Sequence, residues 1–226
     1  MTGRTTKLGH AIAAAAVALA LVTPAQAAVI SLDNVNAQHI PGVTSFITTG
    51  GTMAGMSVTA YFNGQAETAY WESNGALSGG AAGSKWSLTL TGDSFLSCWN
   101  FVNDGAGTLT RLVIDGSSAL TVFDKQQPHF GTDESWAGLD FRSSLAGDQD
   151  IVATYRNPVG VGGAGAVGDL FHILDLDFSK VETTGNFTFK QDTDNDSRFA
   201  VPEPSMLALF GLGLVGAARA RRRARA

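Results

Sequence analysis

The sequence predicts an all-β fold for residues 28–200, a β-sandwich with jelly-roll-like connectivity. Apolar and polar residues alternate with period two in many short runs, and glycine-containing dipeptides typical of tight turns separate these runs. No helical periodicity extends beyond two turns, and no internal repeat suggests a propeller or solenoid. Many short strands joined by glycine-rich turns are typical of a sandwich.

The expected strands each have one apolar face. Residues 56–62 place every second side chain, from Met56 to Phe62, on one face. Residues 170–178 place Asp175 and Asp177 on the face opposite the leucines. The other expected strands are 86–91, 95–102, 109–115, 120–123, 151–155 and 187–189. Tight turns are expected at Asn63-Gly64, Asn74-Gly75, Asp104-Gly105, Asp115-Gly116 and Gly185-Asn186.

The charge distribution separates this domain from the two ends of the chain. The whole chain has a net charge of −5, whereas residues 29–200 contain 8 basic and 19 acidic residues and so carry −11. Nucleic acid is excluded as a partner, because binding it requires basic side chains that neutralise phosphates. With 44% hydrophobic and 15% charged residues, the composition is that of a globular protein rather than a disordered one.

Residues 1–27 have the pattern of a secretory signal peptide. Arg4 and Lys7 precede an uncharged run over residues 11–22, and the small-x-small triplet Ala25-Gln26-Ala27 follows. The alternative is a membrane anchor, but a helix over this run measures about 18 Å, against about 30 Å of hydrocarbon. We therefore expect signal peptidase to cut after Ala27.

Residues 201–226 have a different pattern, in which a proline motif precedes an apolar stretch and a basic end. The motif is Pro202, Glu203, Pro204 and Ser205, the uncharged stretch is Met206–Ala218, and the basic residues are Arg219, Arg221, Arg222, Arg223 and Arg225. The prolines prevent a helix from running in from upstream, and Ser205 can cap a new one. Basic residues after an apolar stretch stay in the cytoplasm and stop transfer, although this stretch is short for a permanent span. We therefore expect transient insertion into the inner membrane.

This tail resembles the PEP-CTERM sorting signal of Gram-negative bacteria, because the Pro-Glu-Pro motif, the apolar helix and the basic end occur in that order. The resemblance implies recognition by an exosortase, a membrane-embedded cysteine transpeptidase-like enzyme, and removal of the tail. It also implies delivery to the cell surface or extracellular matrix, often alongside exopolysaccharide production. The alternative is a plain tail anchor that contains Pro-Glu-Pro by chance.

Three aspartates at alternate positions, Asp192, Asp194 and Asp196, resemble the first half of a calcium-binding loop. Ser197 stands where such a loop needs glycine, and Glu203, at the twelfth position, lies between two prolines. A loose surface calcium site remains one reading of this segment. The other is a solvated acidic turn after the last strand, which the missing half of the ligand set favours.

Other motifs that could support binding or catalysis have simpler interpretations. Residues 160–165 match G-x-G-x-x-G, but no helix follows them, so a flexible loop is expected. His129 lacks a second histidine at ligand spacing, and His172 is expected to be buried and hydrogen-bonded. Cys98, the only cysteine, is expected to be a buried strand thiol. Most of the tryptophans are expected to belong to the core.

These patterns predict an exported, non-enzymatic surface or matrix protein whose domain activity they do not specify. A calcium- or carbohydrate-binding module is the first alternative, suggested by the aspartates and by Trp71 and Trp136, which would stack on sugar rings if exposed. A secreted hydrolase is the second alternative, and would use carboxylate pairs such as Asp133/Glu134 or Asp175/Asp177.

Overall fold

The computed structural model describes residues 28–44, 48–126, 131–132, 135, 138–181 and 183–198. The predicted signal peptide, Pro-Glu-Pro motif, apolar helix and arginine cluster lie outside these described residues. Within the described ranges, the only helices are three short 3-10 helices, η1 (Gly50–Thr52), η2 (Ser117–Ala119) and η3 (Asp148–Asp150). None of the helices in this part of the chain is long and apolar enough to cross a bilayer.

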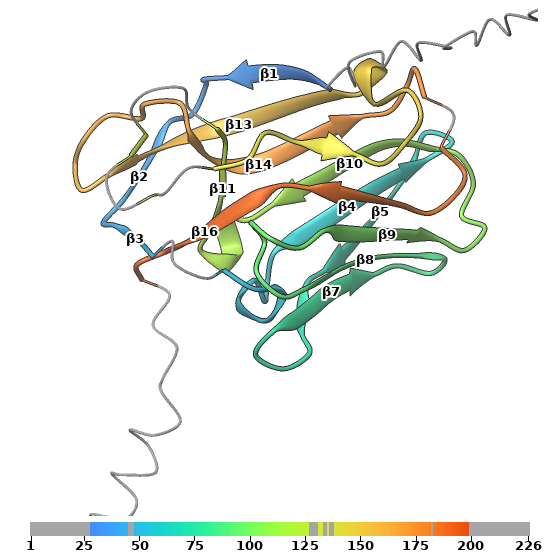
Figure 1. Ribbon diagram of the computed structural model, residues 1–226, viewed down its shortest axis with the longest axis horizontal. Coiled ribbons are helices and arrows are strands. Elements are labelled where there is room, and N and C mark those ends of the chain that lie inside the picture. The colour runs from blue at the N-terminus through green and yellow to red at the C-terminus, as the bar shows by residue number, and fades with distance from the viewer. Residues whose placement is uncertain are drawn as a thin grey trace, which may run out of the picture.

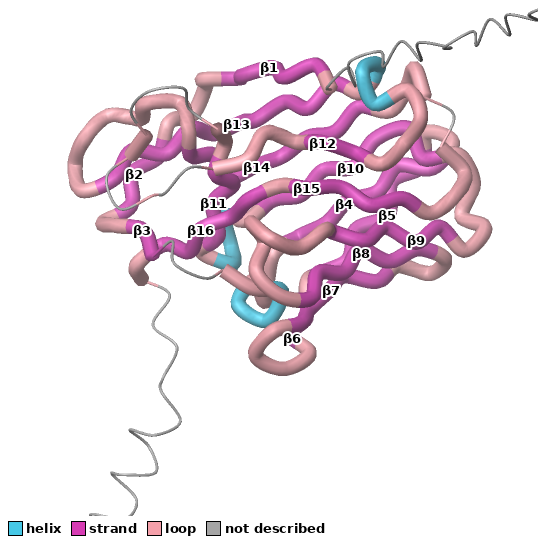
Figure 2. Tube along the Cα trace, in the orientation of Figure 1, coloured by secondary structure: helices cyan, strands magenta, loops and turns pink. Residues whose placement is uncertain are grey.

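Two sheets face each other across the core (Figure 1). The larger sheet has ten strands, with β3, β16, β11, β14, β10, β4 and β5 in spatial order, and β13 lies beside β14 and also pairs with β1 and β2. The smaller sheet has six strands in the order β12, β15, β9, β8, β7 and β6 (Figure 2). Most pairs are antiparallel, whereas β1 and β2 lie parallel to β13. The prediction of an all-β sandwich is confirmed at this level, and the jelly-roll connectivity stays a prediction.

The strand bounds are as follows. The larger sheet contains β1 (Val29–Asp33), β2 (Gln38–Ile40), β3 (Val43–Thr44), β4 (Ser57–Phe62), β5 (Gln65–Tyr70), β10 (Leu109–Asp115), β11 (Thr121–Asp124), β13 (Val152–Val161), β14 (Leu170–Asp177) and β16 (Asp192–Asp196). The smaller sheet contains β6 (Glu72–Ser73), β7 (Ser78–Ala82), β8 (Trp86–Thr91), β9 (Trp99–Asn103), β12 (Arg142–Ser143) and β15 (Phe187–Lys190).

The core lies between the inward faces of the two sheets and is rich in aromatic rings. Trp99 stacks on Phe189 with centroids 5.6 Å apart and meets Trp71 edge-on at 5.3 Å. The larger sheet contributes aliphatic side chains such as Leu112 and Leu174, both fully buried. Period-two alternation thus sends apolar side chains inward from both sheets, which is the arrangement that stabilises a sandwich.

Turn chemistry confirms one predicted hairpin and corrects one predicted strand. Asn63 and Gly64, with φ of 50° and 81°, form the two-residue turn between β4 and β5. The expected strand over residues 95–102 begins only at Trp99, because Asp93 accepts hydrogen bonds from the amides of Phe95 (3.1 Å, to its side chain) and Ser97 (2.8 Å, to its carbonyl) and so holds a turn.

Cys98 lies between that turn and β9, so its predicted burial is wrong and the thiol is exposed.

Strand β7 was missed because a Ser-Gly-Gly-Ala-Ala segment has little β propensity. Its glycines are required by close packing. A Cβ atom on Gly79 would lie 2.1 Å from the carbonyl oxygen of Gly50 and 2.3 Å from the indole nitrogen of Trp71. That indole donates a hydrogen bond of 2.7 Å to the same carbonyl, so the glycine makes room for a buried tryptophan.

Candidate functional site

Three aspartates from two neighbouring strands of the larger sheet converge on one face of it. Strands β11 and β16 are antiparallel, and their register places Asp124 directly opposite Asp192. Asp194 lies two residues further along β16, so it shares a side of the strand with Asp192. Each of the three residues offers a carboxylate oxygen that lies within 4.8 Å of the others. We call Asp124, Asp192 and Asp194 the carboxylate cluster.

The carboxylate cluster is buried. Asp124, Asp192 and Asp194 are 2%, 8% and 1% exposed. Glycine is required beside Asp124, because a Cβ atom on Gly138 would lie 2.3 Å from the Oδ1 atom of Asp124. Among the described residues, no basic side chain forms an ion pair with any of the three carboxylates. Like charges opposite each other on adjacent strands are destabilising, so the cluster needs protons or a cation to offset their repulsion.

Serine hydroxyls provide the neutral polar contacts of the cluster. The Ser94 hydroxyl donates to the Oδ1 atom of Asp192 at 3.0 Å, and the Thr193 amide donates to the same oxygen at 2.8 Å. The Ser135 oxygen lies 2.7 Å from Asp124 Oδ2 and 2.9 Å from Asp194 Oδ2. A hydroxyl has one proton to donate, so one of these two contacts is complete only when its carboxyl group is itself protonated.

Burial raises the pKa of all three carboxyl groups. The pKa of Asp124 rises to about 9, first because the group is removed from water and then because Asp194, Asp192 and Asp169 are negatively charged neighbours. The pKa of Asp192 rises to about 7 through burial and then the charge of Asp194. The pKa of Asp194 rises to about 6, again mainly through burial. Near neutral pH the cluster therefore retains at least one proton unless a cation takes its place.

The donor set of the cluster suits a hard divalent cation. Calcium and magnesium bind carboxylate, carbonyl and hydroxyl oxygens, whereas transition metals favour nitrogen and sulfur ligands. Asp124, Asp192 and Asp194 present only carboxylate oxygens, and the two adjacent serines present hydroxyl oxygens. A bound cation would replace the protons and remove the repulsion among the carboxylates.

The structure brings two of the three aspartates predicted to bind calcium into the cluster and leaves the third outside it. Asp192 and Asp194 belong to the cluster, whereas Asp196 accepts hydrogen bonds from the amide and the guanidinium of Arg198 at 2.9 and 2.8 Å. The expected solvated turn is wrong, because residues 192–196 form strand β16 and all five are buried. Sequence reasoning missed Asp124, which ends a strand far away in the chain and has no local acidic pattern. The calcium hypothesis itself stays a prediction.

Other residues considered from the sequence lie in settings that limit their chemistry. His172 is 3% exposed, and burial lowers the pKa of its imidazole. Trp71 is in the core, so it is not available to stack on a sugar. Residues 160–165 continue β13 to Val161 and then turn at Gly162 and Gly163, both with positive φ. His129, Asp133, Glu134 and Trp136 lie outside the described residues.

Comparisons with known proteins identify the tail alone. No curated protein and no solved structure matches this chain. A family model described as the PEP-CTERM protein-sorting motif matches residues 200–223, which include the Pro-Glu-Pro motif and the apolar stretch. The predicted resemblance is thereby confirmed. The motif implies processing by an exosortase and indicates an exported, surface-directed protein, so the chain carries a PEP-CTERM sorting motif at residues 200–223.

Proposed function

We propose that the β-sandwich is a non-enzymatic domain that its sorting tail delivers to the cell surface or extracellular matrix. Signal peptidase removes residues 1–27, and the stretch Met206–Ala218 holds the chain in the inner membrane until the exosortase acts. The observation that carries this proposal is the match to the sorting motif at residues 200–223. The sandwich is then the part that remains outside the cell.

The settings of the acidic residues support a non-enzymatic role. A glycosidase needs two carboxyl groups that face an open cleft, one on each side of the scissile bond. Asp124, Asp192 and Asp194 are instead buried. Asp175 accepts two hydrogen bonds from Arg111, both of 2.7 Å, and so is engaged by a structural partner. A screen of the purified protein with glycosidic and ester substrates tests this point, and turnover above that of the buffer would contradict it.

The sorting proposal predicts removal of the tail. Intact-mass analysis of protein released from the cell surface should show the loss of Met206–Ala226. Replacing Glu203 with alanine should leave the unprocessed chain in the membrane, because the recognition motif is broken. Replacing Ser197, which lies upstream of the matched residues 200–223, with alanine is the matched control and should leave processing intact. An arginine cluster still attached to fully exported protein would favour a permanent anchor.

A second candidate function is binding of a divalent cation, calcium being the first choice. The observation that favours it is the convergence of three buried carboxylates within 4.8 Å without a basic partner among the described residues. A cation that binds the folded state alone stabilises it by about 2.7 kcal/mol at a hundredfold excess over the dissociation constant. For a domain of this size that corresponds to a rise of roughly 5–10 °C in Tm.

Thermal melts test this second function. Wild-type protein should melt at a higher temperature in millimolar calcium than in chelator, and Asp194→Asn should lose most of the difference. Asp177→Asn, which changes an exposed aspartate on the outer face of the sheet, is the matched control and should respond to calcium as the wild type does. Coincident wild-type midpoints in calcium and chelator would show that the cluster is neutralised by protons alone.

A further inference from the structure

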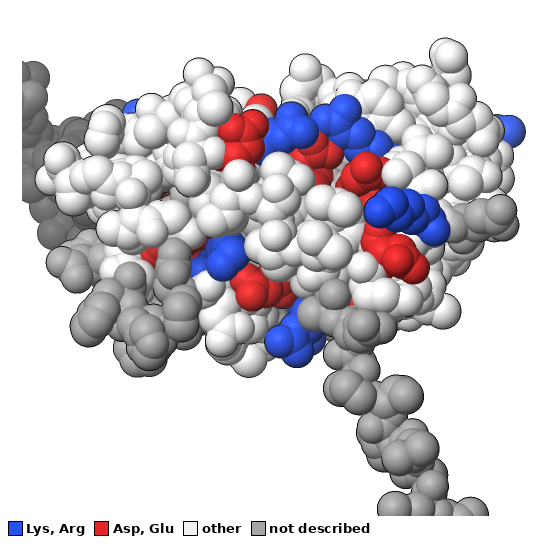
Figure 3. Space-filling model, turned by 90° about the horizontal axis from the view of Figure 1, so that it is seen from above, with Lys and Arg blue, Asp and Glu red and all other residues white. Residues whose placement is uncertain are grey.

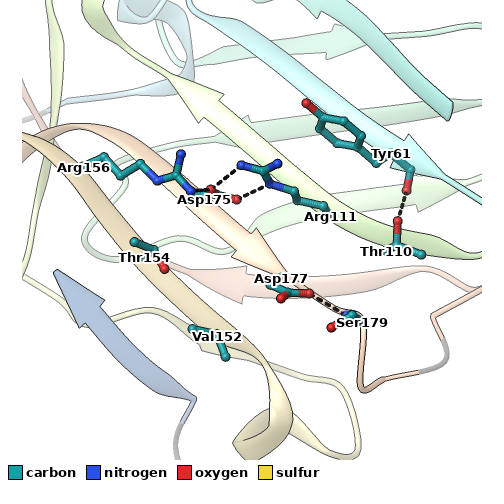
Figure 4. A pocket seen from close by; sticks show the side chains of 9 residues that line it. All are labelled: Tyr61, Thr110, Arg111, Val152, Thr154, Arg156, Asp175, Asp177 and Ser179. Carbon is teal, nitrogen blue, oxygen red and sulfur yellow. Dashed lines mark hydrogen bonds and ion pairs between the residues drawn. The ribbon is translucent and has the colours of Figure 1, made fainter. Parts of the chain in front are cut away.

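A polar hollow lies on the outer face of the larger sheet, away from the core and from the carboxylate cluster. Its volume is about 440 Å³, within the range of small-ligand sites. Figure 4 shows side chains from β4, β10, β13 and β14 around it, together with Ser179. The lining residues are Tyr61, Thr110, Arg111, Val152, Thr154, Arg156, Asp175, Asp177 and Ser179.

Strand register brings these residues together. On β14, Asp175 and Asp177 alternate with the fully buried Leu174 and Leu176, so the aspartates face outward. Arg111 on β10 is opposite Asp177 and Thr154 on β13 is opposite Asp175. The hollow is thus built on paired strands of the sheet, although the register between β10 and β4 shifts at Leu109 to Arg111, beside it.

The two arginines are held in place by one carboxylate. Arg111 donates from Nε to Asp175 Oδ1 and from Nη2 to Asp175 Oδ2, both at 2.7 Å, while Arg156 forms an ion pair with the same Oδ2 atom. The guanidinium carbon of Arg111 also lies 5.3 Å from the ring centroid of Tyr61. Side chains held this way lose little freedom when a ligand binds, which favours recognition.

Hydrogen-bonding capacity in the hollow exceeds what the protein uses. The side chains of Arg111 and Arg156 are 38% and 37% exposed, and a guanidinium has five N–H donors, of which Arg111 uses two on Asp175. Asp177 accepts from the Ser179 amide with one oxygen, at 2.8 Å, which leaves its second oxygen as an acceptor. Thr154 adds a hydroxyl to the lining. The hollow therefore presents unused donors and unused acceptors close together.

Charge decides which class of ligand fits. The charges of the two arginines and two aspartates in the lining sum to zero. Figure 3, which views the molecule from the side of β1 and β13, shows basic and acidic side chains intermixed. Residues 29–200 as a whole carry −11, which disfavours an anionic polymer. A neutral ligand rich in hydroxyl groups can accept from the guanidiniums and donate to Asp177 at once. We propose that this hollow binds a neutral saccharide.

Affinity electrophoresis tests the proposal on the exported, processed protein. Native gels contain glucan, mannan, galactan or xylan, and a parallel gel contains polygalacturonate as an acidic saccharide. We expect retardation by at least one neutral polysaccharide. Thr154→Trp, which fills the hollow, should abolish it, and Asp177→Ala should weaken it about tenfold through the loss of one charged hydrogen bond.

Thr68→Trp is the matched control, because Thr68 is exposed on β5 of the same sheet but does not line the hollow. It should bind as the wild type does, and melts of all variants show that they fold. The proposal is overturned if no neutral polysaccharide retards the wild type, if Thr154→Trp is retarded as strongly as Thr68→Trp, or if only polygalacturonate binds. None of these readouts depends on calcium, so they are independent of the cation hypothesis.

Discussion

Two strands of the larger sheet carry the same Asp-x-Asp pattern, but the carboxylates have different surroundings on each strand. On β14, Asp175 shares its charge with Arg111 and Arg156, and Asp177 is exposed. On β16, Asp192 and Asp194 are buried beside Asp124, and serines and a backbone amide, rather than arginines, donate the hydrogen bonds they accept. Asp175 is neutralised by the protein and Asp177 is solvated, whereas Asp192 and Asp194 require protons or a cation.

The difference arises from the neighbouring strands rather than from the aspartates. Strand β14 lies between β10 and β13, each of which contributes an outward-facing arginine. Strand β16 lies beside β11, which contributes another aspartate at the position opposite Asp192. Identical local spacing therefore yields a fixed ion-pair network in one place and a site whose charge depends on the solution in the other.

The largest effect that separates the two regions should be the pH dependence of stability in chelator. An unfolded aspartate titrates near pH 3.9, and the folded pKa values of Asp194, Asp192 and Asp124 rise to about 6, 7 and 9. Between these limits the folded state binds more protons than the unfolded state, so stability falls as pH rises. We expect Tm to drop by roughly 15 °C or more from pH 5 to pH 8.

His172 acts in the opposite sense, because its lowered pKa makes the folded state more stable as pH rises towards about 6.5. The contribution of one histidine is smaller than that of three carboxyl groups, so stability should still fall as pH rises. Scanning calorimetry in chelator at several pH values measures it. A midpoint that stays level or rises between pH 5 and pH 8 would mean that the carboxylates are solvated or paired in solution.

The next largest effect should come from Asp124→Asn. The amide has the shape of the protonated acid without the cost of holding a proton, so in chelator at pH 8 we expect a gain of about 2 kcal/mol, or roughly 4–8 °C. In millimolar calcium the same substitution should lower the midpoint if a cation binds there, because one of its three carboxylate ligands is lost. If Asp124→Asn shifted Tm in the same direction in chelator and in calcium, cation binding would be contradicted.

The sequence predicted the sandwich because its strands alternate cleanly and its turns carry Asn-Gly and Asp-Gly dipeptides. Residues 109–115 form a strand with the predicted bounds, and Asn63-Gly64 forms the predicted turn. The failures have tertiary causes. Strand β7 is glycine-rich because Trp71 and Gly50 approach it closely, and Phe95 is kept out of β9 by the turn at Asp93.

The candidate site was only half predictable. Spacing singled out Asp192 and Asp194, but the missing half of the calcium-loop ligand set favoured a solvated turn. Nothing local indicates that these five polar residues will pair with β11 and β3. Asp124 and Ser135 reach the cluster from distant parts of the chain, so only the sheet order reveals them. The arginines around Asp175 were missed for the same reason, as they lie on two other strands.

On the β14 side, Asp175→Asn should destabilise the protein by a smaller amount. The substitution leaves Arg111 and Arg156 close together without their shared carboxylate, but both side chains are more than a third exposed, so solvent screens their repulsion. We expect a loss of about 1 kcal/mol, or roughly 2–4 °C in Tm, that does not depend on calcium. Chemical denaturation with and without calcium measures it, and a gain in stability would show that the ion pairs are strained rather than supportive.

The smallest effect should come from Asp177→Asn, two residues away on the same face. Asp177 is exposed, and the contact it makes, acceptance of the Ser179 amide at 2.8 Å, is available to the asparagine carbonyl as well. We therefore expect Tm to change by no more than about 1–2 °C at any pH between 5 and 8, which is the usual range for an exposed substitution. Melts in parallel with Asp194→Asn provide the comparison, because both variants remove one negative charge from an Asp-x-Asp pair. If the two variants shift the midpoint equally, net charge rather than burial governs these aspartates. If only Asp194→Asn shifts it, the contrast between the strands originates in what surrounds each carboxylate.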